Sequence, residues 1–175
     1  MIKNFVRALP VLCLAAAALP AAAQSASGAG SITVIRPLTV TKNTDMTFGT
    51  VVRPASGTGS IAVSAAASAT RTAADGAVAL ASTSHSAAKF TIDGEGGQML
   101  TVTIPATFTM NNNTTSGSLT VTTSHDLGTL TSVQLSNALG AAGTKEFYVG
   151  GSIPIAADTA SGAYSGTFTV SASYN

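Results

Sequence analysis

Two histidines are the residues of this sequence whose types come closest to catalytic chemistry. His125 stands between Ser124 and Asp126, so one stretch contains the serine, histidine and carboxylate of a hydrolase triad. A triad needs the histidine in contact with both partners, yet neighbouring residues of an extended chain point to opposite sides. The sequence also contains no G-x-S-x-G nucleophile elbow. We therefore expect His125 and the second histidine, His85, to be ordinary surface residues.

A glycine-rich acidic stretch, residues 93–97, is the sequence's nearest approach to a metal or phosphate loop. It offers two carboxylates, whereas calcium takes about six to eight oxygen ligands. It also leads into a strand pattern, while a phosphate-binding loop opens a helix. The single cysteine, Cys13, excludes disulfides and cysteine metal sites from the chain beyond it. We predict no catalytic residue, no metal and no cofactor, and a protein that is not an enzyme.

The chain begins with the pattern of a secretory signal peptide, which we place at residues 1–23. Lys3 and Arg7 give it a positive start, an apolar run from Ala8 to Ala18 follows, and three alanines precede the expected cleavage site. The apolar run is too short to span a bilayer. We predict export through the periplasm to the cell surface or the medium, with no membrane span after the signal is removed.

Charge is sparse along the sequence. Eight Lys and Arg face seven Asp and Glu in 175 residues, which leaves neither a basic patch for nucleic acid nor an acidic tail. Residues 24–31 are small and follow no pattern, so we expect a flexible N-terminal arm there. The remaining residues, 32–175, are the right number for a single domain.

Short stretches of alternating apolar and polar residues recur throughout residues 32–175, with turn residues between them. No helical period continues beyond a turn or two. The pattern predicts roughly eight to ten strands and an all-β fold, an antiparallel β-sandwich of the immunoglobulin-like type. Residues 88–92 and 100–104 alternate on either side of the acidic stretch, and we expect them to pair as a hairpin.

The last fourteen residues, 162–175, show the longest alternation in the chain. Apolar side chains on one parity and hydroxyls on the other predict a single strand of about 40 Å. Nothing in this stretch is charged, so nothing discourages another strand from pairing with it. The strand is therefore either buried within a sheet or available to a partner.

Near the start of the domain, four apolar residues share one parity: Ile32, Val34, Leu38 and Val40. Pro37 stands among them and cannot donate a ladder hydrogen bond. We therefore expect this first strand to be bent, bulged or at a sheet edge.

Three stretches stand out in order along the chain: residues 35–42 with 45–49, residues 149–151, and residues 162–175. Together they resemble a secreted bacterial family known as domain of unknown function 4402. The last of them also resembles the C-terminal strand of chaperone–usher pilins, through Gly162 and the penultimate Tyr174.

The pilin resemblance implies an incomplete immunoglobulin-like fold that a neighbour's N-terminal extension completes by donor-strand exchange. A periplasmic chaperone and an outer-membrane usher would be the partners, and Gly162, Tyr164, Phe168, Val170 and Tyr174 would lie on the strand that pairs with the chaperone. The segment from Ile32 to Val40 is then either the donor strand or the domain's own first strand.

We therefore predict a non-enzymatic structural subunit of a bacterial surface fibre or fimbria, which polymerises by β-strand addition. One alternative is an adhesin-like or carbohydrate-binding module. Such a module needs exposed aromatic residues in a groove, and the chain has no Trp and three Tyr. The other alternative is a self-complete, monomeric surface domain.

Overall fold

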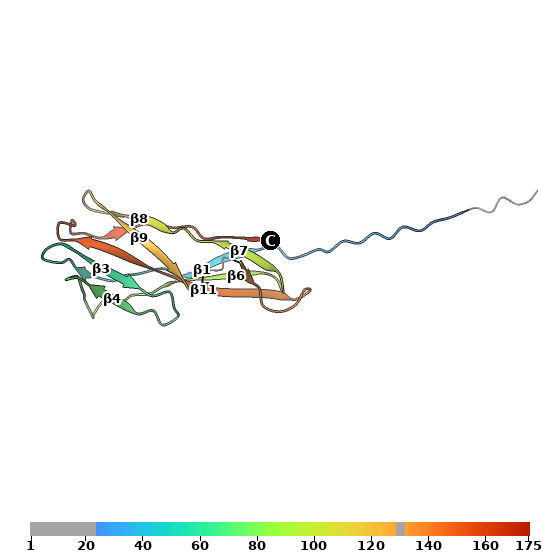
Figure 1. Ribbon diagram of the computed structural model, residues 1–175, viewed down its shortest axis with the longest axis horizontal. Coiled ribbons are helices and arrows are strands. Elements are labelled where there is room, and N and C mark those ends of the chain that lie inside the picture. The colour runs from blue at the N-terminus through green and yellow to red at the C-terminus, as the bar shows by residue number, and fades with distance from the viewer. Residues whose placement is uncertain (1–23, 129–131) are drawn as a thin grey trace, which may run out of the picture. The chain divides into compact units, whose positions relative to one another are not determined.

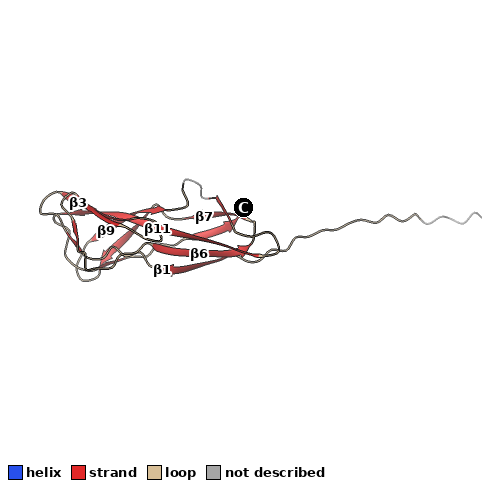
Figure 2. Ribbon diagram, turned by 90° about the horizontal axis from the view of Figure 1, so that it is seen from below, coloured by secondary structure: helices blue, strands red, loops and turns tan. Residues whose placement is uncertain are grey.

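The computed structural model describes residues 24–128 and 132–175 (Figures 1 and 2). The described residues form strands, turns and loops without a helix, and all strand pairs are antiparallel. The prediction of an all-β fold is confirmed. Residues 24–33 and residues 34–175 are separate units, of which the second holds every strand. The proposed signal peptide lies outside the described residues.

Thirteen strands make up the part of the domain that the structure describes, most of them short. Within the described residues, no helix is long and apolar enough to cross a membrane. The strands are β1 (Thr39–Thr44), β2 (Val51–Val52), β3 (Thr58–Val63), β4 (Arg71–Ala74), β5 (Val78–Ala79), β6 (Ala88–Glu95), β7 (Met99–Thr103), β8 (Thr107–Asn112), β9 (Ser118–His125), β10 (Ser132–Gln134), β11 (Ala142–Ala156), β12 (Tyr164–Ser165) and β13 (Ser171–Tyr174).

Strand β11, with fifteen residues, runs along the large sheet and organises it (Figure 1). That sheet has the order β1-β6-β11-β9-β8-β12, and β3 and β4 extend it beside β11. β11 changes partner from β6 to β3 around Gly150 and Gly151. A side chain at Gly150 would place its Cβ 2.3 Å from the Val63 carbonyl oxygen, so only glycine allows this close approach.

A small sheet, β10-β7-β13, packs against one part of the large sheet, and β2 pairs with β5 separately. Two clusters of buried apolar side chains form the core. The first cluster joins β6 and β11 to the small sheet: Ala88, Phe90, Ile92, Leu100, Val102, Leu135, Phe147 and Val149. The second cluster lies around β3, β9 and the far half of β11: Phe48, Ile61, Val63, Val121, Ile153 and Ile155.

The predicted hairpin between residues 88–92 and 100–104 is wrong. β6 and β7 belong to different sheets and face each other across the first cluster. The backbone between them bonds elsewhere, because the Gly96 N–H donates to Ala141 and the Gly97 N–H to Leu135. Gly97 has a φ of 72°, which turns the chain from one sheet to the other.

The single terminal strand predicted for residues 162–175 is also wrong. β12 pairs with β8 in the large sheet and β13 pairs with β7 in the small one. Between Tyr164 and Ser171 the segment advances seven residues while its partners advance nine, from Thr103 to Asn112. Pro105 lies in the longer stretch, and its missing N–H prevents a continuous ladder.

Phe147→Ala tests the packing of the first cluster. The ring is fully buried and stacks on Phe90 at 5.5 Å between centroids. We expect the substitution to lower the free energy of unfolding by about 3–5 kcal/mol, measured by urea denaturation. Tyr148→Ala on the same strand, where the side chain is only partly buried, is the control and should cost clearly less. Equal losses for the two variants would contradict this assignment of the core.

Candidate functional site

Two sheet edges near the first cluster contain most of the residues that the sequence singled out. Within the described part of the chain, β1 pairs only with β6, and residues 162–175, which we call the terminal segment, pair only with β7 and β8. Each therefore has one side without a neighbouring strand. Backbone N–H and C=O groups on such a side can pair with another strand.

The core-facing side of β1 is only partly covered. Val40 lies opposite Ile92 in the ladder, so the two side chains share a face. Ile92 is fully buried, whereas Val40 remains 37% exposed. Lys42 lies opposite Phe90, and its ammonium group pairs with the carboxylate of Asp45. β1 is thus an edge strand, as Pro37 had suggested, and its inner face lacks a full set of neighbours. A bulge follows Lys42, away from Pro37, which precedes the strand.

The middle of the terminal segment is held by side chains rather than by a ladder. Residues 166–170 belong to no strand, and nothing in the described chain pairs with them. Phe168 lies 5.9 Å from Phe90 and 4.9 Å from Phe108 between ring centroids, and Val170 packs on the same cluster. Both remain half-buried. This stretch has an anchored apolar side and a free backbone.

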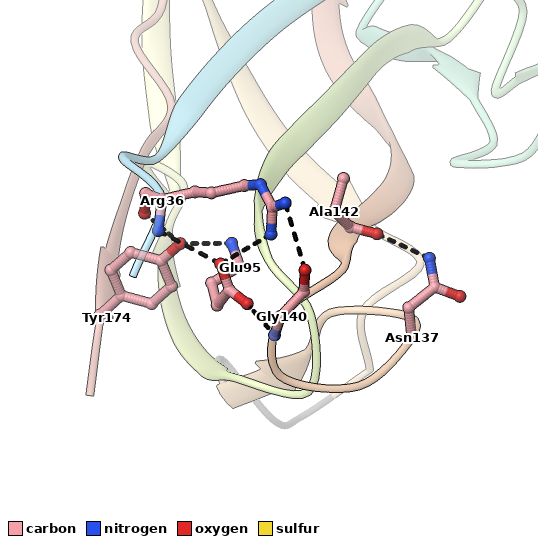
Figure 3. A network of polar contacts seen from close by, with 6 residues as sticks. All are labelled: Arg36, Glu95, Asn137, Gly140, Ala142 and Tyr174. Carbon is pink, nitrogen blue, oxygen red and sulfur yellow. Dashed lines mark hydrogen bonds and ion pairs between the residues drawn. The ribbon is translucent and has the colours of Figure 1, made fainter. Parts of the chain in front are cut away.

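Tyr174 fastens the end of the terminal segment to two distant parts of the domain (Figure 3). Its hydroxyl accepts a hydrogen bond from the Glu95 N–H at 2.7 Å and donates one to the Arg36 carbonyl at 2.9 Å. Gly94 makes room for it, since a Cβ there would lie 2.4 Å from the hydroxyl oxygen. The end of β13 is therefore joined to the end of β6 and to the residues that precede β1.

Glu95 is the centre of this network. Its side chain is 3% exposed, and it pairs with Arg36, whose Nη1 lies 2.9 Å from Oε2. The Arg36 N–H donates to the same oxygen at 3.3 Å, and the Gly140 N–H donates to Oε1. The hydrogen bond from Gly140 lowers the pKa of Glu95 most, and the contacts with Arg36 lower it further. The pKa therefore stays below its ordinary value, although burial of the carboxylate acts to raise it. We call Arg36, Glu95, Gly140 and Tyr174 the clamp.

Sequence reasoning missed the clamp. The alternation that places Asp93 outward gives Glu95 the same parity, so the pattern favours an exposed loop carboxylate. Its partners lie 59 and 79 residues away in the chain, beyond the reach of any local pattern. The sequence had drawn attention to Tyr174 through its penultimate position and to Glu95 only as one of two carboxylates in a glycine-rich loop.

The other predicted site residues lie at different places. Gly162 has a φ of 151° and lies against Asn112, where a Cβ would come within 2.6 Å of the amide. Tyr164 belongs to β12 and donates its hydroxyl to the Ala160 carbonyl at 2.7 Å. Together with Phe168, Val170 and Tyr174, these residues follow one extended path, although it crosses two sheets.

The four apolar residues near the start of the domain do not share one strand. Val40 is in β1, and Leu38, just before it, packs against the first cluster. Ile32 and Val34 precede the strand and are 87% and 80% exposed. Of this set, the first strand of the domain therefore contains Val40 alone, and Ile32 and Val34 have no strand partner in the described chain.

The residue types of a hydrolase triad do not assemble into one. The Asp126 carboxylate accepts the Tyr148 N–H at 2.9 Å, and His125 Nδ1 has no hydrogen-bond partner among the described residues. The carboxylate therefore does not orient the imidazole. Within the described ranges, no group of three His, Cys, Asp or Glu could hold a metal ion.

The fold and these edges define the class: an all-β domain of antiparallel sheets in which, among the described residues, β1 and the terminal segment each have an unpaired side. The family model described as Domain of unknown function (DUF4402) matches residues 38–174, and the chain belongs to this family. The match extends from the residue before β1 to the clamp tyrosine. No curated protein and no solved structure matches the chain.

Tyr174→Phe removes both hydroxyl hydrogen bonds while keeping the ring. Because it leaves the Glu95 N–H without a partner, we expect a loss of about 1–3 kcal/mol in the free energy of unfolding, measured by urea denaturation. Tyr164→Phe, which removes one hydroxyl bond to the Ala160 carbonyl, is the matched control and should lose less. Indistinguishable stabilities of wild type and Tyr174→Phe would refute the role of the hydroxyl.

The clamp carboxylate also predicts acid sensitivity. The folded state lowers the pKa of Glu95 from 4.5, so its stabilising contribution is complete above that value and disappears as the pH falls through the lowered pKa. Glu95→Gln has no such titration. We therefore expect the melting temperature of the wild type to exceed that of Glu95→Gln near neutral pH, with a gap that narrows on acidification. A gap independent of pH would contradict the ionised state of Glu95.

Proposed function

We propose that this protein is an exported, non-enzymatic structural subunit of a bacterial surface fibre, which assembles by β-strand addition at its open edges. One observation carries the proposal. Core-facing side chains on β1 and the terminal segment remain partly exposed, and residues 166–170 between β12 and β13 have no paired backbone. An added strand would pair with this backbone and cover these side chains.

The chemistry of the edge favours a strand as its occupant. Edge strands of soluble proteins usually carry charges, prolines or bulges that prevent further pairing. The terminal segment carries no charge and no proline. Its apolar side is already anchored by Phe168 on two neighbouring rings, so the backbone is held extended before a partner arrives. Such an arrangement lowers the entropy lost on binding.

A second copy of the chain is the occupant that we favour. Ile32 and Val34 alternate with polar Thr33, are largely exposed, and precede the strand that the domain keeps for itself. They can therefore present apolar side chains to a neighbour at the spacing of a β-strand. A periplasmic chaperone and an outer-membrane usher are the accessory partners that this route requires.

The main competing function is a binding module, an adhesin or a carbohydrate-binding domain. A hollow of about 310 Å³ lies where β3, β4, β9 and β11 meet, and serine and threonine hydroxyls line much of it. No aromatic or charged side chain lines this hollow, although stacking aromatics are typical of sugar sites. A self-complete monomer is the third reading, and it predicts that the edges bind nothing.

Replacing the exposed arm residues tests the proposal. We expect Ile32→Asp with Val34→Asp to abolish polymerisation of the exported protein, measured by size-exclusion chromatography and electron microscopy, because a charge cannot enter an apolar contact unpaired. Val78→Asp, at another exposed apolar position, is the control and should polymerise as the wild type does. A wild-type protein that stays monomeric and captures no peptide of residues 24–36 would refute the proposal. Binding of the isolated protein to a glycan array would favour the competing function.

A further inference from the structure

The residues around the start of β1 contain a near repeat with a six-residue spacing. Ile32, Thr33, Val34, Ile35 and Arg36 are followed, after Pro37, by Leu38, Thr39, Val40, Thr41 and Lys42. Both halves read as a branched apolar residue, threonine, valine, one variable residue and a cation. The second half contributes β1, and the first half precedes it.

This repeat gives the domain two candidates for its first strand. Because six is an even number, a six-residue slip along β6 keeps every side chain on its own face of the sheet. Val34 would then take the place of Val40 opposite Ile92, and Arg36 that of Lys42 opposite Phe90. The hydrophobic pattern alone therefore does not distinguish the two registers.

Pro37 does not exclude the slipped register either. It would fall at the position of Asn43, where the ladder between β1 and β6 is already irregular. A residue at a bulge needs no ladder hydrogen bond, so proline is tolerated there. Asn43 would leave its present contact with the Thr91 hydroxyl, which is an exposed hydrogen bond.

The clamp does distinguish the two registers. In the present one, Arg36 offers its guanidinium and its backbone N–H to Glu95, and its carbonyl accepts the Tyr174 hydroxyl. A six-residue slip would bring Gly30 to this place. The Glu95 carboxylate, 3% exposed, would lose its cation. Leaving a buried carboxylate without its partner is strongly unfavourable, and buried polar pairs are known to select register.

We propose that the clamp selects the register of the first strand. It commits residues 38–42 to the domain and leaves residues 32–35 as a spare strand of the same design. The register selection stands on the domain alone, whereas use of the spare strand by a second copy rests on the proposed function. Arg36 and Glu95 act here as positioning residues.

Cysteine pairs can report the register directly. Thr39 and Asp93 are partners across the ladder, while the slipped register would bring Thr33 opposite Asp93. The experiment uses two double variants in a Cys13→Ser background, Thr39→Cys/Asp93→Cys and Thr33→Cys/Asp93→Cys. Intramolecular cross-linking by a short thiol-reactive reagent is quantified by mass spectrometry at a dilution that suppresses contact between copies.

With the clamp intact, we expect cross-linking of the first pair and only background for the second. Adding Glu95→Gln or Arg36→Gln should raise cross-linking of the second pair by at least about tenfold. Glu146→Gln breaks the partly exposed Lys89–Glu146 pair, which joins β6 to β11, and should leave both yields unchanged. Two clamp variants are used because Glu95→Gln removes the buried charge itself and should leave a folded domain even if Arg36→Gln, which leaves that carboxylate without its cation, does not.

Background cross-linking of the second pair in both folded clamp variants would overturn the proposal, as would equal effects of Glu95→Gln and Glu146→Gln. Polymerisation is measured on the same variants at high concentration. Failure of the wild type to polymerise would count against the proposed function and leave the register result intact. A clamp variant that slips should also lose polymerisation, because its spare strand is then used within its own domain.

Discussion

One buried carboxylate determines how the segments at this end of the domain are arranged. Glu95 lies almost out of contact with water, and removing a charge from water is costly unless hydrogen bonds and an opposite charge replace the solvent. The replacements come from Arg36, before β1, and from Gly140, in the loop before β11. Tyr174 adds the end of β13 through the Glu95 backbone. Because these contacts share one centre, four segments must be in place together.

Contacts at both ends of residues 166–170 explain how an unpaired backbone can exist in an ordered domain. Residues 166–170 have no ladder, yet β12 is fixed to β8 on one side of them and β13 to β7 on the other. Phe168 adds an aromatic contact in the middle. The stretch is therefore extended because both of its ends and its side chains are held, and the hydrogen-bonding capacity of its backbone is left for another strand. The domain is therefore ordered even though the backbone of this one stretch remains open to pairing.

Alternation in the sequence predicted which faces are buried better than which strands are neighbours. Phe90, Ile92, Leu100 and Val102 are all buried, as their parity indicates. Parity reports only the face of a side chain, however, and these residues meet across the core instead of along one sheet. The effect of Pro105 on the terminal segment was missed for a related reason. The proline interrupts pairing with residues 166–170, which are remote from it in the chain. Glu95 was missed because its partners are remote in the chain.

The same limit on local patterns has a consequence for how a strand-exchanging protein can be built. A chain that both keeps a first strand and offers a similar one needs two stretches with the same alternation, and such stretches compete for one place in the sheet. Apolar packing cannot distinguish the two stretches, because Val34 and Val40 would fill the same place with the same side chain. A buried polar contact can distinguish them, since an ion pair is lost completely when one of its two residues moves away. Placing the discrimination in Arg36 and Glu95 leaves the apolar pattern free to be used twice.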